Sequence, residues 1–389
     1  MKLIQKTGVI LLIAFIAGCS ANGNKIIQVE NKLPIDRDFE TIELSKEILG
    51  VDSLQNIAIK DLTDGSVKVS QLVDNNGDGK MDLLLFQVNI KANSKLKFEI
   101  TSFDKNSIPE STDFCYSRFV PERIDDYTWE NNRVAFRVYG PTAQKMVEQN
   151  IPGGTLSSGV DAWLKRVEYP IINKWYKETI EGTGSYHKDT GEGLDNFHVG
   201  VSRGVGGIAI ESDENYYYSK NYTDWRTITT GPVRTSFYLK YADWDANGNL
   251  ITESRIISLD YGSNLSKFEI FLKGSKSISV GLTMHEKNGV VASNPKYGWT
   301  NYYEPLEDSE ISTAIVASPN TYISSKTYDV DQKDLSNVYT KIKVVDDKAV
   351  YYSGFFWKKS KQFKNNAEWE NYLNGFAARL ASPLVISVY

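Results

Sequence analysis

The chain has 389 residues, of which 41% are hydrophobic and 24% are charged, and its formal net charge is −5. That length can bury a large core without disulfide staples, and it suits one large domain or two smaller ones. The acidic balance argues against nucleic acid as a partner, although local arginines can still bind an acidic sugar.

The first nineteen residues have the features of a bacterial lipoprotein leader. A basic start precedes an apolar run over 9–17, which is too short to span a membrane as a helix of about 20 residues. The run ends in IAGC at 16–19, which looks like a lipobox. We therefore expect cleavage before Cys19, lipidation of its thiol, and attachment to a bacterial membrane through the lipid alone, with the outer membrane facing the periplasm as the expected site. An ordinary signal peptide that is cut nearby is the alternative.

Alternating apolar and polar residues, the pattern of half-buried strands, dominate the rest of the chain. The clearest examples are 96–100, 134–138, 233–241, 268–272 and 278–282, and turn sequences stand at 75–79, 245–249 and 261–264. Helical signals are confined to 142–150, 161–167 and 366–380, and a last strand is expected at 384–389. The pattern predicts an all-β fold, a large antiparallel β-sandwich with a few short helices. We expect one catalytic β domain over 20–389, in which an N-terminal strand-rich portion packs against the rest.

Oxygen-bearing side chains recur in the segment DNNGDGKMD, residues 74–82. Four of them follow the spacing of the first half of a calcium loop: Asp74, Asn76, Asp78 and Asp82. The glutamate that closes an EF-hand loop is missing, because Leu85 stands in its place. A hairpin turn explains the same residues, since Asn-Gly and Asp-Gly are strong turn formers. We favour the turn, and a calcium ion bound here would be structural.

The segment 119–141 combines an aromatic ring with several charged groups. Trp129 is a candidate for stacking on a sugar ring, and Arg137 is a candidate for two-point binding of a carboxylate. An ion-paired strand edge is the structural alternative for the same residues.

Two of the three histidines of the chain, His187 and His198, fall in the glycine-rich stretch 185–207. Histidine is the usual proton carrier near neutral pH, and glycine lets the backbone approach a ligand closely. This stretch is therefore the best active-site candidate in the sequence. The competing interpretation is a pair of glycine-rich turns whose histidines only satisfy hydrogen bonds. No G-x-S-x-G, HExxH or CxxC motif offers another chemistry.

Four segments together resemble the DUF4861 family of bacterial secreted proteins. They read PERIDDYTWENNRVAFRVYGP, SSGVDAWLKRVEYPIINKWY, SYHKDTGEGLDNFHVGVSRGVGG and GPVR. The resemblance extends from about Lys25 to the C-terminus. It implies a galactose-mutarotase-like β-sandwich and a place in polysaccharide utilisation, because the family includes an oligosaccharide dehydratase that acts on ulvan. The implied reaction removes water across C4 and C5 of a terminal glucuronate or iduronate and leaves a 4,5-unsaturated uronyl end.

We therefore expect a lyase of the hydro-lyase type that requires no cofactor and acts on uronate-terminated, ulvan-type oligosaccharides. The α-proton of a uronate is poorly acidic, so a cation must neutralise the carboxylate while one group removes the proton and another protonates the leaving oxygen. The expected proton carriers are His187, His198 and Tyr222. The expected substrate-binding residues are Arg203, Arg234, Arg137, Trp129 and His285. A polysaccharide lyase, a non-catalytic surface sugar-binding lipoprotein and, more weakly, a mutarotase-like epimerase are the alternatives.

Overall fold

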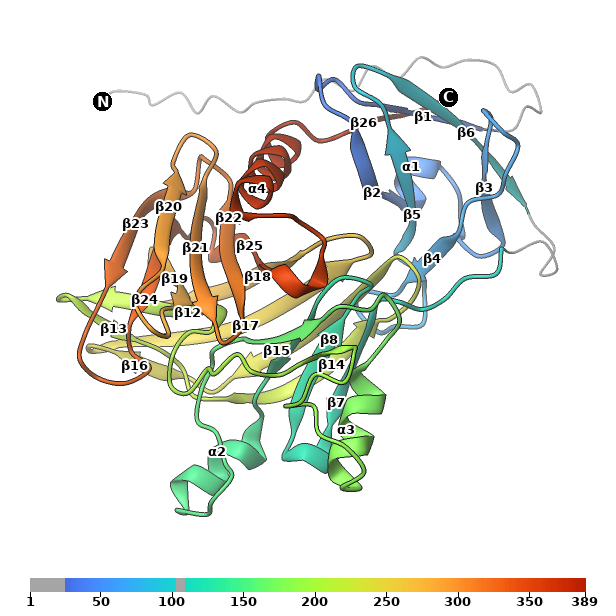
Figure 1. Cartoon of the computed structure of the whole chain (residues 1–389). Coiled ribbons are helices and arrows are strands. Elements are labelled where there is room, and N and C mark those ends of the chain that lie inside the picture. Colours follow the sequence, from blue (N-terminus) through green and yellow to red (C-terminus); the bar gives the residue numbers. More distant parts are fainter. Residues whose placement is uncertain (1–24, 103–108) are drawn as a thin grey trace, which may run out of the picture.

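The computed structural model describes residues 25–102 and 109–389, so Cys19 and its predicted lipidation lie outside the described residues. All pairs of named strands are antiparallel. Helices are few and short, so the predicted mainly antiparallel β fold is confirmed (Figure 1). In the described part of the chain, no helix combines the length and the apolar character needed to cross a bilayer.

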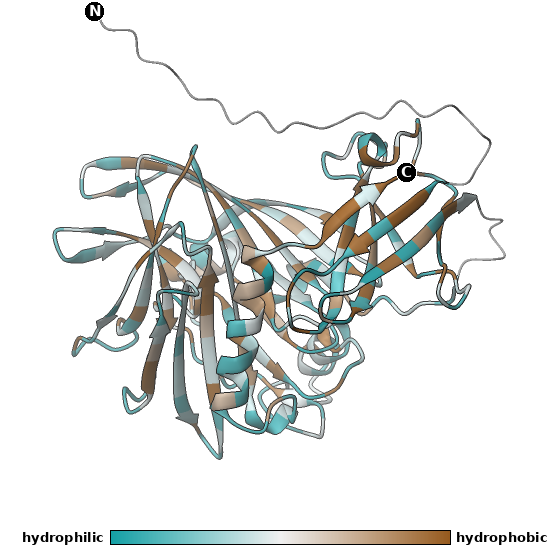
Figure 2. Ribbon diagram, turned by 90° about the horizontal axis from the view of Figure 1, so that it is seen from above, coloured by the Kyte–Doolittle hydropathy of each residue, from teal (hydrophilic) through white to brown (hydrophobic). Residues whose placement is uncertain are grey.

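Two small sheets form the N-terminal part. One has the order β26 (Val385–Val388), β1 (Ile26–Glu30), β6 (Lys95–Ser102) and β3 (Ile57–Asp61). The other has the order β2 (Arg37–Ser45), β5 (Leu83–Ile90) and β4 (Ser70–Val73), and α1 (Lys46–Leu49) follows β2. Hydrophobic and hydrophilic residues alternate along these strands (Figure 2), and the apolar side chains of both sheets share one core. The C-terminal strand β26 completes this part by pairing with β1.

Three larger sheets form the main body. The first has the order β11 (Gly193–Leu194), β10 (Asp161–Lys165), β9 (Ala135–Val138), β8 (Asp126–Glu130) and β7 (Tyr116–Val120). The second has the order β13 (Asn215–Tyr217), β12 (Val205–Ser212), β19 (Ser277–Thr283), β24 (Asn337–Lys343) and β23 (Tyr322–Tyr328). The third runs β14 (Tyr222–Thr229), β15 (Arg234–Tyr241), β17 (Asn249–Asp260), β18 (Leu265–Lys273), β25 (Lys348–Trp357), β22 (Ser309–Ala317), β21 (Trp299–Leu306) and β20 (Val290–Asn294), with β16 (Trp244–Ala246) paired to β17.

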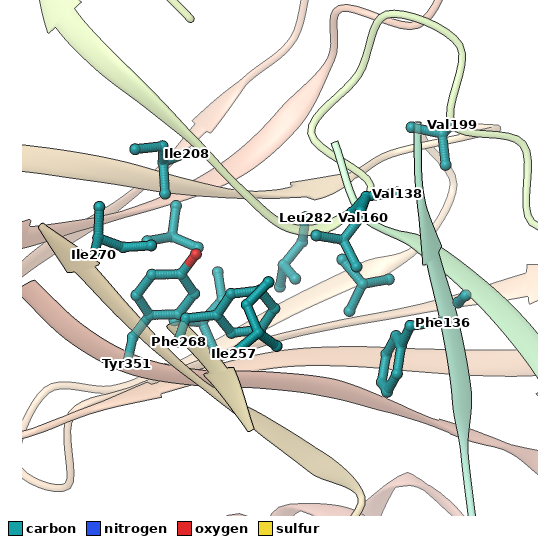
Figure 3. Packing of buried hydrophobic residues seen from close by; sticks show 14 of the residues in the cluster. Phe136, Val138, Val160, Val199, Ile208, Ile257, Phe268, Ile270, Leu282 and Tyr351 are labelled. Atoms are coloured by element: carbon teal, nitrogen blue, oxygen red, sulfur yellow. The ribbon is translucent and has the colours of Figure 1, made fainter. Parts of the chain in front are cut away.

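One continuous hydrophobic core joins the three sheets of the main body. Phe136 comes from the first sheet, Ile208 and Leu282 from the second, and Ile257 and Phe268 from the third (Figure 3). All five side chains are buried. Because one core holds the three sheets together, the loops at their edges start from fixed positions, which gives a site built on those loops a rigid base.

The helices show where the sequence pattern succeeds and where it fails. The predicted helices at 142–150 and 366–380 appear as α2 (Pro141–Glu148) and α4 (Asn366–Ala381), and α4 covers β21 and β22. The helix predicted at 161–167 is wrong, because this segment is strand β10. All five residues of β10 are buried, the charged Asp161 and Lys165 included, so the strand has no exposed polar face and shows no period of two. The helix α3 (Ile172–Ile180) was not predicted.

Candidate active site

A cavity of about 610 Å³ opens beside the first sheet of the main body, and both histidines of the glycine-rich stretch line it. Its lining is given by Arg123, Arg137, Tyr139, Val147, residues 154–156, His187 and residues 195–201. The side chains of His187 and His198 are 62% and 58% exposed, so neither ring is enclosed by packing. Two larger hollows, of about 690 and 790 Å³, have no histidine in their walls. We therefore take the histidine cavity as the candidate active site.

A main-chain contact fixes the tautomer of His187. Its Nδ1 lies 2.7 Å from the carbonyl oxygen of Asp195. A carbonyl oxygen can only accept a hydrogen bond, so Nδ1 carries the proton in the neutral ring and Nε2 keeps its lone pair. The Tyr186 ring packs edge-on against the imidazole with 4.6 Å between ring centres. A neutral His187 is thereby set up to accept a proton at Nε2.

His198 is held by contacts to two other loops. Its Nε2 lies 3.0 Å from Oδ2 of Asp334, which favours a proton on this nitrogen. Its carbonyl oxygen accepts a hydrogen bond from Nε2 of His285 at 2.9 Å. Gly200 is required beside it, because its φ is +53° and a Cβ would meet the Asp334 carboxylate at 2.2 Å.

His285, a predicted substrate-binding residue, lies behind the cavity and does not line it. Its Nδ1 lies 2.5 Å from Oε1 of Glu304, a buried carboxylate on β21. Burial works against a charge on this ring, but the hydrogen bond and charge of Glu304, the His198 carbonyl and the charge of Asp334 together outweigh burial and raise the pKa of His285. Its place in the structure is to support the loop that carries His198.

Arg137 on β9 forms the floor of the cavity and is held by three carboxylates. Its Nε lies 2.9 Å from Oδ2 of Asp161, which is its cross-strand neighbour on β10. Its Nη2 lies 2.9 Å from Oδ2 of Asp195, and its Nη1 lies 3.8 Å from Oδ2 of Asp126 on β8. Its guanidinium also packs over the Trp163 ring at 5.2 Å. Arg137 therefore orders the carboxylates of the site and has little capacity left for a ligand.

The three carboxyls around Arg137 carry more negative charge than one guanidinium can balance. Burial raises the pKa of Asp126 to about 6, although Arg137 and Arg123 both pull it down. Burial and the neighbouring carboxylate of Asp195 raise the pKa of Asp161 as well. Oδ1 of Asp126 and Oδ1 of Asp161 are buried and have no hydrogen-bond partner among the described residues. The cluster is therefore expected to keep a proton at a mildly acidic pH.

Arg123, which sequence reasoning left out of the predicted site, is the second guanidinium of the cavity. It ends the short 3₁₀ turn η2 (Pro121–Arg123) in the β7–β8 hairpin, and Ile124 and Asp125 follow it with φ values of +49° and +66°. Left-handed geometry is unusual for a β-branched residue. Arg123 lies in the charged segment PERIDD between two strands, which is the one sequence feature that marks it. Nothing in this segment predicts the left-handed turn that follows.

The family model for the Domain of unknown function (DUF4861) matches residues 29–386. The chain belongs to the DUF4861 family. A curated relative, the "Uncharacterized protein P7" of Formosa agariphila, is 50% identical over 369 residues, which cover 94% of this chain and 93% of the relative.

Solved structures show a more distant likeness. A protein in the Glycosyl Hydrolase Family 38 from Enterococcus faecalis superposes with a TM-score of 0.53 and 10% identity, over 95% of this chain and 48% of that one. An α-mannosidase from Enterococcus faecalis V583 gives a TM-score of 0.48 at the same identity, over 95% and 46%. This DUF4861 member spans about half the length of the solved chains that it matches, and the likeness bears on the fold alone.

Three other predicted residues of the DUF4861 member are placed in its interior. Trp129 is fully buried, and its Nε1 donates to Oγ of Ser266, so it offers no surface to a sugar. Arg203 is fully buried against the Tyr218 ring, with 3.7 Å from its Cζ to the ring centre. Tyr222 belongs to the main core, and burial raises its pKa far above the ordinary value. The predicted roles of these three in the site are corrected, because packing encloses Trp129 on β8, Tyr222 on β14 and Arg203 in the loop before β12.

Arg234 lies in a different part of the molecule, at the joint between the N-terminal sheets and the main body. Its guanidinium binds Asp260 at 2.5 and 2.9 Å, and Glu43 of β2 at 2.7 Å. Gln71 of β4 completes the joint, since its Oε1 accepts from the backbone amides of Val233 and Arg234 at 2.9 Å each. The GPVR segment therefore fastens two parts of the fold together and does not line the histidine cavity.

The loop 74–82 has the contacts of a closed turn. Both carboxylate oxygens of Asp74 accept backbone amides, from Gly77 and Gly79 at 2.7 Å each. Asn76, Asp78 and Asp82 accept backbone amides in the same way. Within the residues that the structure describes, no group of three or more His, Cys, Asp or Glu side chains is arranged to hold a metal ion. The turn accounts for these four residues without calcium, and no metal enters the proposal below.

Proposed function

We propose that this protein is a carbohydrate dehydratase that eliminates water across C4 and C5 of a terminal uronic acid, with ulvan-type oligosaccharides as the substrate class. One observation carries the proposal: a single cavity holds two exposed imidazoles beside guanidinium groups. This set of groups matches the needs of elimination next to a carboxylate, namely a base, an acid and a cation.

The contacts of the two histidines support a different role for each. His187 presents a lone pair at Nε2, because Nδ1 donates to the Asp195 carbonyl, and it therefore acts as the base that removes the proton from C5. His198, held by the carboxylate of Asp334, acts as the acid that protonates the oxygen on C4. The C5–H and C4–O bonds break, a C4=C5 double bond forms, and water leaves. The base gains one proton and the acid loses one, so exchange with solvent restores both groups.

The negative charge of the substrate carboxylate is the main obstacle to removing the C5 proton. Removal of the C5 proton builds an enolate-like transition state on a group that is already a carboxylate. A nearby guanidinium stabilises this charge best where water is partly excluded, and Arg137 on the floor of the cavity is buried. This argument favours a uronate over a neutral sugar as the substrate.

The decisive experiment incubates the purified protein with glucuronate- and iduronate-ended oligosaccharides from ulvan, and with pectin-derived oligosaccharides for comparison. We expect ultraviolet absorption of an unsaturated uronate to rise while the mass of the oligosaccharide falls by one water. An unsaturated product that arises by chain cleavage, without loss of water, would instead identify a polysaccharide lyase. Tight binding without any product would identify a sugar-binding protein, and either result overturns the proposal.

We further propose that Cys19 anchors the protein to the outer membrane, facing the periplasm. The support is the IAGC sequence at residues 16–19 and the apolar run before it. Metabolic labelling with a palmitate analogue should mark the wild type but not a Cys19→Ser variant. Equal labelling of both would contradict the anchor.

A further inference from the structure

The two guanidinium groups of the cavity differ in how far their bonding capacity is used. Arg137 is bound by Asp161 and Asp195 and lies near Asp126. Arg123 makes one long hydrogen bond, from Nε to the hydroxyl of Tyr186 at 3.4 Å. Within the described residues, its Nη1 and Nη2 have no hydrogen bond and no ion pair. A half-buried guanidinium with two free donor nitrogens matches the two oxygens of a carboxylate.

The turn that carries Arg123 is strained but firmly held. Ile124 and Asp125 have left-handed backbone geometry, which is strained for residues other than glycine. The hydroxyl of Tyr222 donates to the Asp125 carbonyl at 2.5 Å, and the Thr142 amide donates to the Asp125 carboxylate at 3.1 Å. Gly140 leaves room for this contact, since a Cβ there would meet the Asp125 carbonyl at 2.0 Å. The surrounding fold therefore fixes the point from which the Arg123 side chain starts.

The charge near the cavity also favours a cation at this position. Asp195 in the lining, with the buried Asp126 and Asp161 that surround Arg137, gives more carboxyls than Arg137 can balance, and this cluster opposes an anionic ligand. Arg123 is the other cation of the lining among the described residues, apart from histidine. The negative charge of Asp126 is one of the influences that favour the charged form of Arg123.

We propose that Arg123 binds the carboxylate of the substrate sugar and makes this site prefer acidic sugars over neutral ones. This inference rests on the proposed function for its choice of ligand. It takes the place of Arg203, Arg234 and Arg137, the three arginines that the sequence suggested for substrate binding. Tyr222, predicted as a proton carrier, becomes a positioning residue that holds the turn behind Arg123.

The test compares binding of a disaccharide that ends in glucuronate with binding of the same disaccharide ending in glucose, by calorimetry. We expect the wild type to prefer the glucuronate-ended probe, and an Arg123→Gln variant to bind it about 10- to 100-fold more weakly, since a hydrogen-bonded charged pair is lost. Binding of the glucose-ended probe should not change. An Arg123→Lys variant should recover part of the preference, because it restores the charge without the fork geometry. Arg118→Gln is the matched control, since Arg118 lies on β7 and pairs with Glu122 outside the cavity.

A change in the ligand gives a second test that does not depend on how the variant folds. The methyl ester of the glucuronate-ended probe should bind the wild type as weakly as the glucose-ended probe does. An unchanged preference for glucuronate in Arg123→Gln, or a wild type without any preference, overturns the inference. These outcomes are separate from dehydration. Loss of the preference in a protein that never releases water would support Arg123 and overturn the proposed reaction, whereas dehydration with an intact preference in Arg123→Gln would do the reverse.

Discussion

His187 and Asp195 are joined through the main chain, with 2.7 Å between the imidazole Nδ1 and the Asp195 carbonyl oxygen, while the Asp195 carboxylate turns to Arg137. One residue thus sets the tautomer of the proposed base with its backbone and completes the buried charge cluster with its side chain. The exposed ring and the buried cluster are therefore linked through one residue. A shift of the loop at Asp195 would disturb both the base and the floor of the cavity.

Replacement of His187 by alanine should stop catalysis without unfolding the protein. Loss of a general base typically lowers the rate by 10²- to 10⁴-fold, and we expect kcat to fall within that range. The side chain is 62% exposed, so the midpoint of thermal unfolding should change little. Lys188→Ala is the control, because Lys188 is the exposed neighbour in the chain and does not line the cavity. Wild-type rates in His187→Ala would contradict the assigned role.

Ionisation of Asp126 should lower the stability of the protein as pH rises, while carboxyls with a lowered pKa, such as Asp260 and Glu269, act in the opposite direction. The folded carboxyl of Asp126 holds the proton up to about pH 6, whereas an unfolded aspartate releases it near pH 4. Between these values this group binds more protons in the folded state than in the unfolded state, so its contribution to the free energy of unfolding decreases as pH rises and levels off above pH 6. The difference of about two pKa units corresponds to about 3 kcal/mol.

An Asp126→Asn variant isolates this effect. Asparagine still accepts the hydrogen bond from the Tyr176 hydroxyl, which binds Oδ2 of Asp126 at 3.0 Å, but it does not titrate. Urea unfolding at several pH values between 4 and 7 should show the variant gaining stability relative to the wild type as pH rises. Parallel curves for the two proteins would mean that Asp126 is ionised throughout this range.

The sequence predicted much of the fold because strand alternation is local. The stretch at 233–241 matches β15 from Arg234 onward, and the stretch at 268–272 lies in β18, both in the third sheet. The sequence analysis also grouped His187 and His198, which line one cavity, because the glycines of their loop can be read directly from the sequence. It could not place Trp129 or Arg203, because both sit on strand or loop positions whose partners come from distant segments. It missed Arg123 for the related reason that a left-handed turn without glycine has no local signature.

Replacement of Arg234 should lower stability and leave substrate binding unchanged. This result would distinguish its place at the joint of the fold from the substrate-binding role that the sequence suggested. An Arg234→Gln variant leaves the Asp260 carboxylate, which that guanidinium holds, without its charged partner. Burial raises and Arg234 lowers the pKa of Asp260, with a net lowering in the folded protein. The two side chains are partly exposed, at 17% and 24%, so the loss of this charged hydrogen bond should cost about 1–3 kcal/mol. We expect a lower midpoint in chemical unfolding, while KM for a glucuronate-ended oligosaccharide stays at the wild-type value. A raised KM at unchanged stability would return Arg234 to the substrate site, and would imply that the joint between the N-terminal sheets and the main body takes part in recognition.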